Sequence, residues 1–145
     1  MSPAPRLFLD ASVWIAASGS PTGASALILA LCGRGLARAV TSRLVLLESE
    51  RNIQAKLGDD ALARFYTSIA DLPMEILDVP TPEEIQAQGK TIHPKDAHVL
   101  ASAIKGEAEY LLTLDRRHFL APSVRRTKLS FAILTPGDYL RRLIT

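Results

Sequence analysis

The sequence predicts an α/β protein: a three-layer α/β/α sandwich around a short, mainly parallel central sheet of about five strands. Short apolar runs, typical of buried strands, alternate along the chain with longer segments of helical spacing. The chain has 145 residues, the size of one compact domain, so residues 1–145 are expected to form a single domain. Hydrophobic residues make up 48% and charged residues 22%, which excludes a disordered or a fibrous chain.

The first part of the chain predicts a strand followed by two helical segments. Residues 6–10 are a short apolar run closed by an acid, which is typical of a buried strand. A turn of helix is expected over residues 12–17. Apolar residues then recur at helical spacing from Ala26 to Leu31, until Gly33 ends this helix.

A second strand is expected at residues 37–41, and two helices follow it. Ser42 is a suitable N-cap for a helix that runs to about residue 57. Acidic residues at positions 59 and 60 begin another helix, whose apolar residues share one face up to Leu72. The chain therefore returns to helix after each predicted strand.

The second half of the chain repeats this alternation. Residues 74–79 predict a third strand, and the sequence Thr81-Pro82-Glu83-Glu84 is a capping box that begins a short helix. A helix is expected from Pro94 to Lys105, with Gly106 as its end. Residues 110–114 and 130–134 predict the fourth and fifth strands, and Thr135-Pro136 repeats the capping pattern before a last amphipathic helix.

The cysteine content and the N-terminal sequence bear on the compartment. The single cysteine, Cys32, excludes an internal disulfide framework and a zinc site built from cysteines. The first six residues contain no apolar segment, and the longest apolar run covers only residues 26–32. We therefore expect no signal peptide, no membrane span and a cytoplasmic location.

The net charge of +2 conceals an uneven distribution of charged residues. Residues 71–115 carry three basic and nine acidic side chains, whereas residues 116–145 carry seven basic and one acidic. A basic C-terminal segment is often only a solvated surface, but it is also the charge pattern of a nucleic-acid contact.

Three aspartates are expected to lie at one edge of the predicted sheet. Asp10 follows the first strand and Asp115 follows the fourth, and the carboxyl ends of parallel strands form the functional crevice of such sheets. Asp96 begins a helix that runs away for about 15 Å at 1.5 Å per residue. The fourth strand returns by about 16 Å at 3.3 Å per residue. Asp96 and Asp115 are therefore expected at the edge where Asp10 lies.

Glu48 extends this set of acids. It lies in the first turns of the helix after the second strand, and helical side chains tilt toward the N-terminus of their helix. Four converging carboxylates repel unless protons or a cation compensate, and oxygen ligands suit Mg²⁺ or Mn²⁺ rather than zinc. Taken singly, each acid also has a simpler explanation as a turn, dipole or solvent-facing residue.

These residues, in this order, resemble a PIN domain, the metal-dependent ribonuclease fold used by toxins of the VapBC type. The resemblance covers nearly the whole chain, and its most specific part runs from Asp96 to Asp115. The matching segments are residues 7–14, 41–48, 96–103, 110–115 and 133–136.

The resemblance implies a set of site residues and a cofactor. The catalytic acids would be Asp10, Glu48, Asp96 and Asp115, with one or two Mg²⁺ or Mn²⁺ ions held by Asp10, Asp96 and Asp115. Ser12 and Thr113 would support these carboxylates. Glu50 competes with Glu48, which is preferred for its spacing from Ser42. RNA phosphates would be bound by Arg116, Arg117, Arg125 and Arg126.

The resemblance also implies partners, and other functions remain open. An RNA substrate, a small antitoxin and a homodimer would be typical of the family. A PIN fold that binds RNA or acts as a scaffold without catalysis is one alternative. A phosphoacceptor receiver-type domain is another, but it needs paired acids after the first strand. The three histidines, His118 included, are interpreted as capping or surface residues, and Phe8 and Trp14 as core or dimer contacts.

Overall fold

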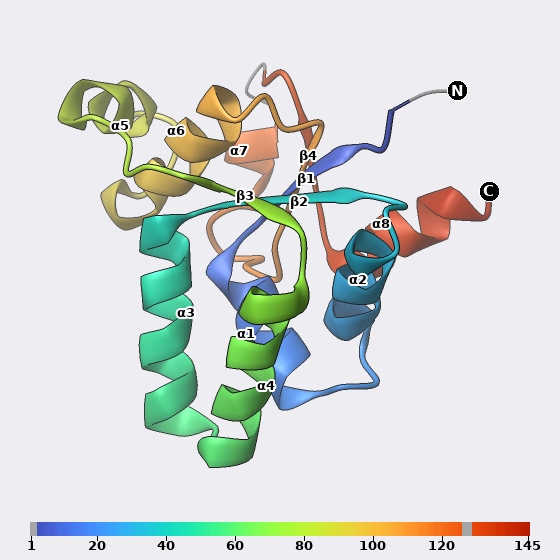
Figure 1. Cartoon of the computed structure of the whole chain (residues 1–145). Helices are drawn as coiled ribbons and strands as arrows, with labels where there is room; N and C mark the ends of the chain where they lie inside the picture. The colour runs from blue at the N-terminus through green and yellow to red at the C-terminus, as the bar shows by residue number, and fades with distance from the viewer. Residues whose placement is uncertain (1–2, 126–128) are drawn as a thin grey trace.

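The computed structural model, which describes residues 3–125 and 129–145, contains one five-stranded sheet (Figure 1). The strand order is β3-β2-β1-β4-β5, and each neighbouring pair is parallel. This confirms the predicted α/β class and the number of strands. That residues 1–145 form a single domain stays a prediction. The strands are β1 (Arg6–Leu9), β2 (Arg38–Ser42), β3 (Met74–Leu77), β4 (Tyr110–Leu112) and β5 (Ala132–Leu134).

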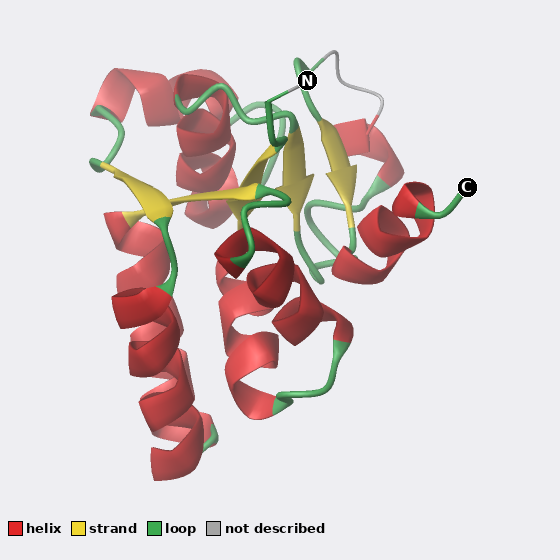
Figure 2. Cartoon of the chain, turned by 45° about the vertical axis from the view of Figure 1, so that its right-hand side comes forward, coloured by secondary structure: helices red, strands yellow, loops and turns green. Residues whose placement is uncertain are grey.

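Helices cover both faces of the sheet (Figures 1 and 2). On one face, α5 (Pro82–Gln88) packs beside α6 (Ala97–Lys105); on the other face lie α1 (Ala11–Gly19) and α2 (Ala24–Gly33). The antiparallel pair α3 (Arg43–Lys56) and α4 (Asp59–Asp71) packs against α1 and extends away from the sheet (Figure 1). The last helix, α8 (Pro136–Leu143), contacts α2 and β5.

The helix starts predicted from capping residues are confirmed. The Ser42 hydroxyl accepts a hydrogen bond from the Val45 N–H at 3.2 Å. At α5, the Thr81 hydroxyl accepts from the Glu84 N–H, and the Glu84 carboxylate accepts from the Thr81 N–H, which completes the capping box. The Thr135 hydroxyl caps α8 by accepting from the Asp138 N–H. These side chains satisfy backbone donors that have no partner inside a helix.

The structure differs from the sequence prediction around residues 94–125. A short 3₁₀ helix, Pro94–Asp96, precedes α6, so Asp96 lies at the N-cap rather than inside the helix. The fourth strand ends at Leu112 instead of residue 114. The Thr113 N–H still donates to the Leu134 carbonyl, but the N–H groups of Leu114 and Asp115 donate to side-chain hydroxyls. A four-residue helix, α7 (Pro122–Arg125), was not predicted.

No single helix in the described ranges is long and apolar enough to cross a membrane. Helices α1 and α2 together are long and apolar enough to do so, but the chain bends by 101° at the break between them.

The close packing around Gly106 leads to a first prediction. A Cβ atom added there would lie 2.7 Å from Leu77 Cδ1 and 3.2 Å from both Val40 Cγ1 and the Ser102 carbonyl oxygen. Gly106→Ala is therefore expected to lower the free energy of unfolding by about 1–3 kcal/mol, measured by urea denaturation. Gly89→Ala is the matched control, because its nearest atom would be 3.4 Å away. Equal stability of the two variants would contradict this packing argument.

Candidate metal centre

The carboxyl edge of the sheet brings together the ends of β1 and β4. Leu9 is paired with Leu112, and the Asp10 N–H donates to the Leu112 carbonyl at 3.1 Å. Asp10 and Thr113 are therefore the next residues of two adjacent parallel strands. Asp10 and Asp115, which the sequence predicts at this edge, come from segments that the structure brings together there.

Two hydroxyl groups hold the Asp10 carboxylate. Thr113 Oγ1 donates to Asp10 Oδ2 at 2.8 Å, and Ser12 Oγ donates to the same oxygen at 3.1 Å. The hydroxyls are themselves fixed, because Ser12 Oγ accepts from the Leu114 N–H and Thr113 Oγ1 accepts from the Asp115 N–H. Burial raises the pKa of Asp10, which is only 7% exposed; hydrogen bonds oppose this shift and the nearby charge of Asp96 adds to it.

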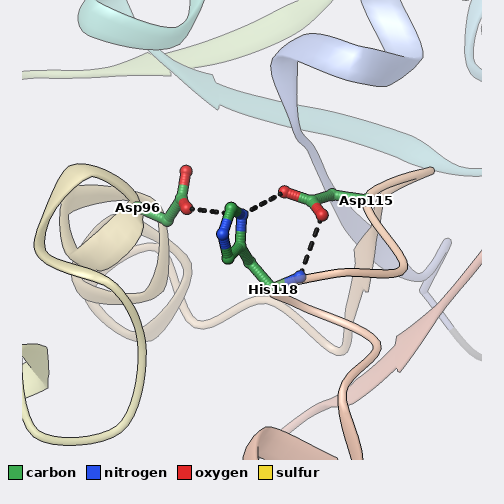
Figure 3. A group of neighbouring side chains, drawn as sticks. All are labelled: Asp96, Asp115 and His118. Atoms are coloured by element: carbon green, nitrogen blue, oxygen red, sulfur yellow. Dashed lines mark hydrogen bonds and ion pairs between the residues drawn. The ribbon is translucent and has the colours of Figure 1, made fainter.

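A second group of ligand-type side chains consists of Asp96, Asp115 and His118 (Figure 3). His118 Nδ1 lies 3.1 Å from Asp115 Oδ2 and 3.3 Å from Asp96 Oδ2, so the imidazole stands between the two carboxylates. One ligand atom from each of the three residues lies within 4.8 Å of the other two.

The backbone explains why these three side chains meet. Asp115 Oδ1 accepts hydrogen bonds from the N–H groups of Arg117 and His118, which folds residues 115–118 into a tight turn. Asp96 reaches the same place from the N-cap of α6. Burial raises the pKa of Asp96; the neighbouring histidine rings, with His118 first, oppose this shift when they carry a proton, and the Asp115 carboxylate adds to it.

Glu48 completes the group from α3. Burial raises the pKa of Glu48, the negative charges of Asp10 and Asp96 raise it further, and Arg51 opposes the shift. Glu50 points elsewhere, since its Oε2 accepts a hydrogen bond from the Tyr66 hydroxyl on α4 at 2.6 Å. The structure therefore places Glu48, and not Glu50, near the other acids.

The remaining predicted site residues are more scattered. Arg116 and Arg117 are exposed in the turn that follows Asp115. Arg125 is the last residue of α7, and Arg126 lies outside the described residues. His118 was treated as a capping or surface residue, yet it contacts two of the predicted acids. Its spacing from Asp115 was a signal, because the third residue after a turn-forming aspartate folds back toward it.

The donor set fits a divalent cation. Carboxylate oxygens from Asp96 and Asp115 converge, Asp10 is buried beside them, and the pKa values of Asp10, Glu48 and Asp96 are raised in part by one another's charge. A hard cation relieves this repulsion and accepts oxygen ligands. Such an ion would be held by Asp96 and Asp115. Asp10, which lies at the same edge of the sheet, would also contribute to holding it.

The fold and the site together define an α/β protein with a cluster of carboxylates at the carboxyl edge of a parallel sheet. Comparison with known proteins shows the family to which it belongs. The family model described as the PIN domain matches residues 6–117. The chain belongs to the PIN domain family, as its sequence resemblance implied.

Solved structures share the fold at low sequence identity. The Pyrobaculum aerophilum protein PAE2754 has a TM-score of 0.63 and 18% identity, with 99% of this chain and 94% of that chain covered. Mycobacterium tuberculosis VapC20, a sarcin-ricin loop cleaving toxin, has a TM-score of 0.57 and 16% identity, with 77% of this chain and 91% of that chain covered. FitAcB from Neisseria gonorrhoeae has a TM-score of 0.59 and 16% identity, with 90% of this chain and 98% of that chain covered. A search of curated protein sequences finds no match.

Proposed function

We propose that this protein is an endoribonuclease that hydrolyses RNA phosphodiester bonds with Mg²⁺ or Mn²⁺, and that it is the toxin of a toxin–antitoxin pair. The observation that carries the proposal is the convergence of Asp10, Glu48, Asp96 and Asp115 at one edge of the sheet. Membership of the PIN domain family supports the reaction class. The likeness to VapC20, a toxin that cleaves the sarcin-ricin loop, supports RNA as the substrate.

Each acid has a part in this mechanism that follows from its surroundings. A bound divalent ion would lower the pKa of a water molecule and stabilise negative charge on the scissile phosphate. Asp96 and Asp115 would hold the ion directly, and Asp10 would hold it or one of its waters, oriented by Ser12 and Thr113. Glu48, which interacts electrostatically with Asp10 and Asp96, would lie outside these ligands and orient them or a water molecule of the ion.

The substrate would approach the same edge from outside. The guanidinium groups of Arg116 and Arg117 follow Asp115 directly and are exposed, so they can bind phosphate oxygens through paired N–H donors. Arg125 and Arg126 would extend this contact along the RNA. The N-terminus of α6 at Asp96 adds a partial positive charge to the phosphate site.

The proposal includes partners and a location, and the comparisons support an antitoxin partner. Structures of the same fold include VapBC2 from Rickettsia felis bound to a promoter DNA fragment and FitAB bound to a DNA fragment. We extend to this chain a small antitoxin that blocks the acidic crevice, a homodimeric assembly and a cytoplasmic location.

Cleavage of a structured RNA by the purified protein tests the proposal. We expect cleavage in Mn²⁺ or Mg²⁺, no cleavage in EDTA, and at least about 100-fold slower cleavage by Asp96→Asn purified in the same way. A wild-type rate no higher than that of Asp96→Asn would show that the activity does not belong to this site. In that case a PIN fold that binds RNA without catalysis becomes the better explanation.

A further inference from the structure

His118 places a nitrogen donor among the acids. The ring atom Nδ1 faces both carboxylates, at 3.1 Å from Asp115 Oδ2 and 3.3 Å from Asp96 Oδ2 (Figure 3). Two anchors fix this position: the His118 N–H donates to Asp115 Oδ1 at 2.9 Å, and the next residue, Phe119, is buried in the core. The ring is therefore held in place by the turn and by the core.

The separations suit two neighbouring ligands of one metal ion. Adjacent ligands of an octahedral ion with bonds of about 2.1 Å lie about 3.0 Å apart. The distances from His118 Nδ1 to Asp115 Oδ2 and to Asp96 Oδ2 are close to this spacing. One ligand atom of each residue lies within 4.8 Å of the other two, so a single ion can be reached by the nitrogen and both oxygens. Such an ion would replace the present hydrogen bond between His118 Nδ1 and Asp115 Oδ2.

The other two histidines are less suited to this role. His93 Nδ1 already accepts a hydrogen bond from the Lys95 N–H at 3.2 Å. The His93 ring packs against the His118 ring, with centroids 5.5 Å apart, and so restricts movement of His118 away from the carboxylates. His98 Nδ1 is buried and has no hydrogen-bond partner within the described ranges. Among the described residues, His98 does not belong to any cluster of side chains that could hold a metal ion.

We propose that His118 Nδ1 is a third protein ligand, beside Asp96 and Asp115, and that it makes the site prefer Mn²⁺ over Mg²⁺. This inference rests on the proposed function, because it assumes that the acidic edge binds a divalent ion. A neutral imidazole with its proton on Nε2 presents a lone pair at Nδ1. Mg²⁺ prefers oxygen ligands and retains water, whereas first-row transition ions bind imidazole more readily.

Calorimetric titration with Mn²⁺ and with Mg²⁺ tests this preference. His118→Asn replaces the ring nitrogen with a side-chain amide, whose oxygen favours the harder ion. We expect this variant to lower the ratio of Mn²⁺ affinity to Mg²⁺ affinity by about tenfold. His93→Asn is the matched control, since it removes a neighbouring imidazole that does not face both carboxylates, and the ratio should not change.

Electron paramagnetic resonance gives a second measurement that does not depend on activity. Mn²⁺ bound to wild-type protein labelled with ¹⁵N-histidine should show a magnetic coupling to an imidazole ¹⁵N nucleus. The coupling should persist in His93→Asn and disappear in His118→Asn. Circular dichroism of each variant establishes that it is folded before the metal is added.

The outcomes separate the two proposals. If wild type binds neither ion, or Asp96→Asn binds both as well as wild type does, the proposed metal site is wrong. If wild type binds both ions but His118→Asn keeps the wild-type affinity ratio, and no nitrogen coupling is seen, only the role of His118 is wrong. A lower ratio together with loss of the coupling supports the assignment of His118 as a ligand.

Discussion

Asp10→Asn is expected to stabilise the metal-free protein and, at the same time, to slow RNA cleavage by at least about 100-fold. Burial raises the pKa of Asp10 in the folded protein above its unfolded value. A raised folded-state pKa means that the stabilising contribution is complete below the unfolded pKa and is lost as the pH rises through the folded pKa. At neutral pH Asp10 is ionised in the unfolded chain, so its raised pKa in the folded protein opposes folding, and asparagine removes this opposition.

Thermal denaturation in EDTA at several pH values measures the stability effect. At pH 7 the free energy of unfolding of Asp10→Asn should exceed that of wild type by about 1 kcal/mol. This difference should shrink as the pH falls from the raised folded-state pKa of Asp10 toward its unfolded pKa, and it should no longer change below the unfolded pKa. Asp78→Asn is the matched control, because Asp78 follows strand β3 but is exposed, and it should change stability by less than about 0.5 kcal/mol. A less stable Asp10→Asn at neutral pH would contradict the argument.

Trp14→Ala is expected to lower the free energy of unfolding by about 3–5 kcal/mol, the largest stability effect we predict. Trp14 is 0% exposed, and its ring meets Phe65 of α4 edge to face with centroids 6.4 Å apart. It lies on α1, which packs against both α3 and α4. The cavity left by alanine would therefore loosen the attachment of the α3–α4 pair to the rest of the protein.

Trp14→Phe separates packing from polarity at this position. Trp14 Nε1 is buried without a hydrogen-bond partner in the ranges 3–125 and 129–145, so phenylalanine removes an unsatisfied donor together with some volume. Its loss of stability should therefore be well below that of alanine, by urea denaturation followed with circular dichroism. A Trp14→Ala variant within about 1 kcal/mol of wild type would contradict the assignment of Trp14 to the core.

Local signals predicted most of the fold. Ser42, Thr81 and Thr135 begin helices because a hydroxyl at the N-cap satisfies a backbone donor only a few residues away. The positions of Asp10 and Asp115 after parallel strands followed from topology alone, since these strands end at the same edge. The helix α7 was missed because four residues carry too little periodicity to be recognised.

Details of the site that depend on tertiary contacts could not be predicted from the sequence. Glu48 and Glu50 are both glutamates and lie two residues apart in the sequence. The structure distinguishes them through Tyr66, which lies on a different helix and donates a hydrogen bond to Glu50. His118 contacts Asp96 only because the turn at Asp115 directs the ring toward α6. The sequence showed the Asp115–His118 spacing but not the direction in which the imidazole would point.

The central position of β1 has a consequence for the time at which the protein becomes active. Asp10 is made early during translation, but the Thr113 hydroxyl that holds it lies 103 residues later in the chain. At a synthesis rate of 5–20 residues per second, the ribosome needs about 5–20 s to add this length. A nascent chain therefore carries Asp10 with the Ser12 hydroxyl but without the Thr113 hydroxyl until β4 has emerged, so the site that we propose for RNA cleavage is incomplete up to that point.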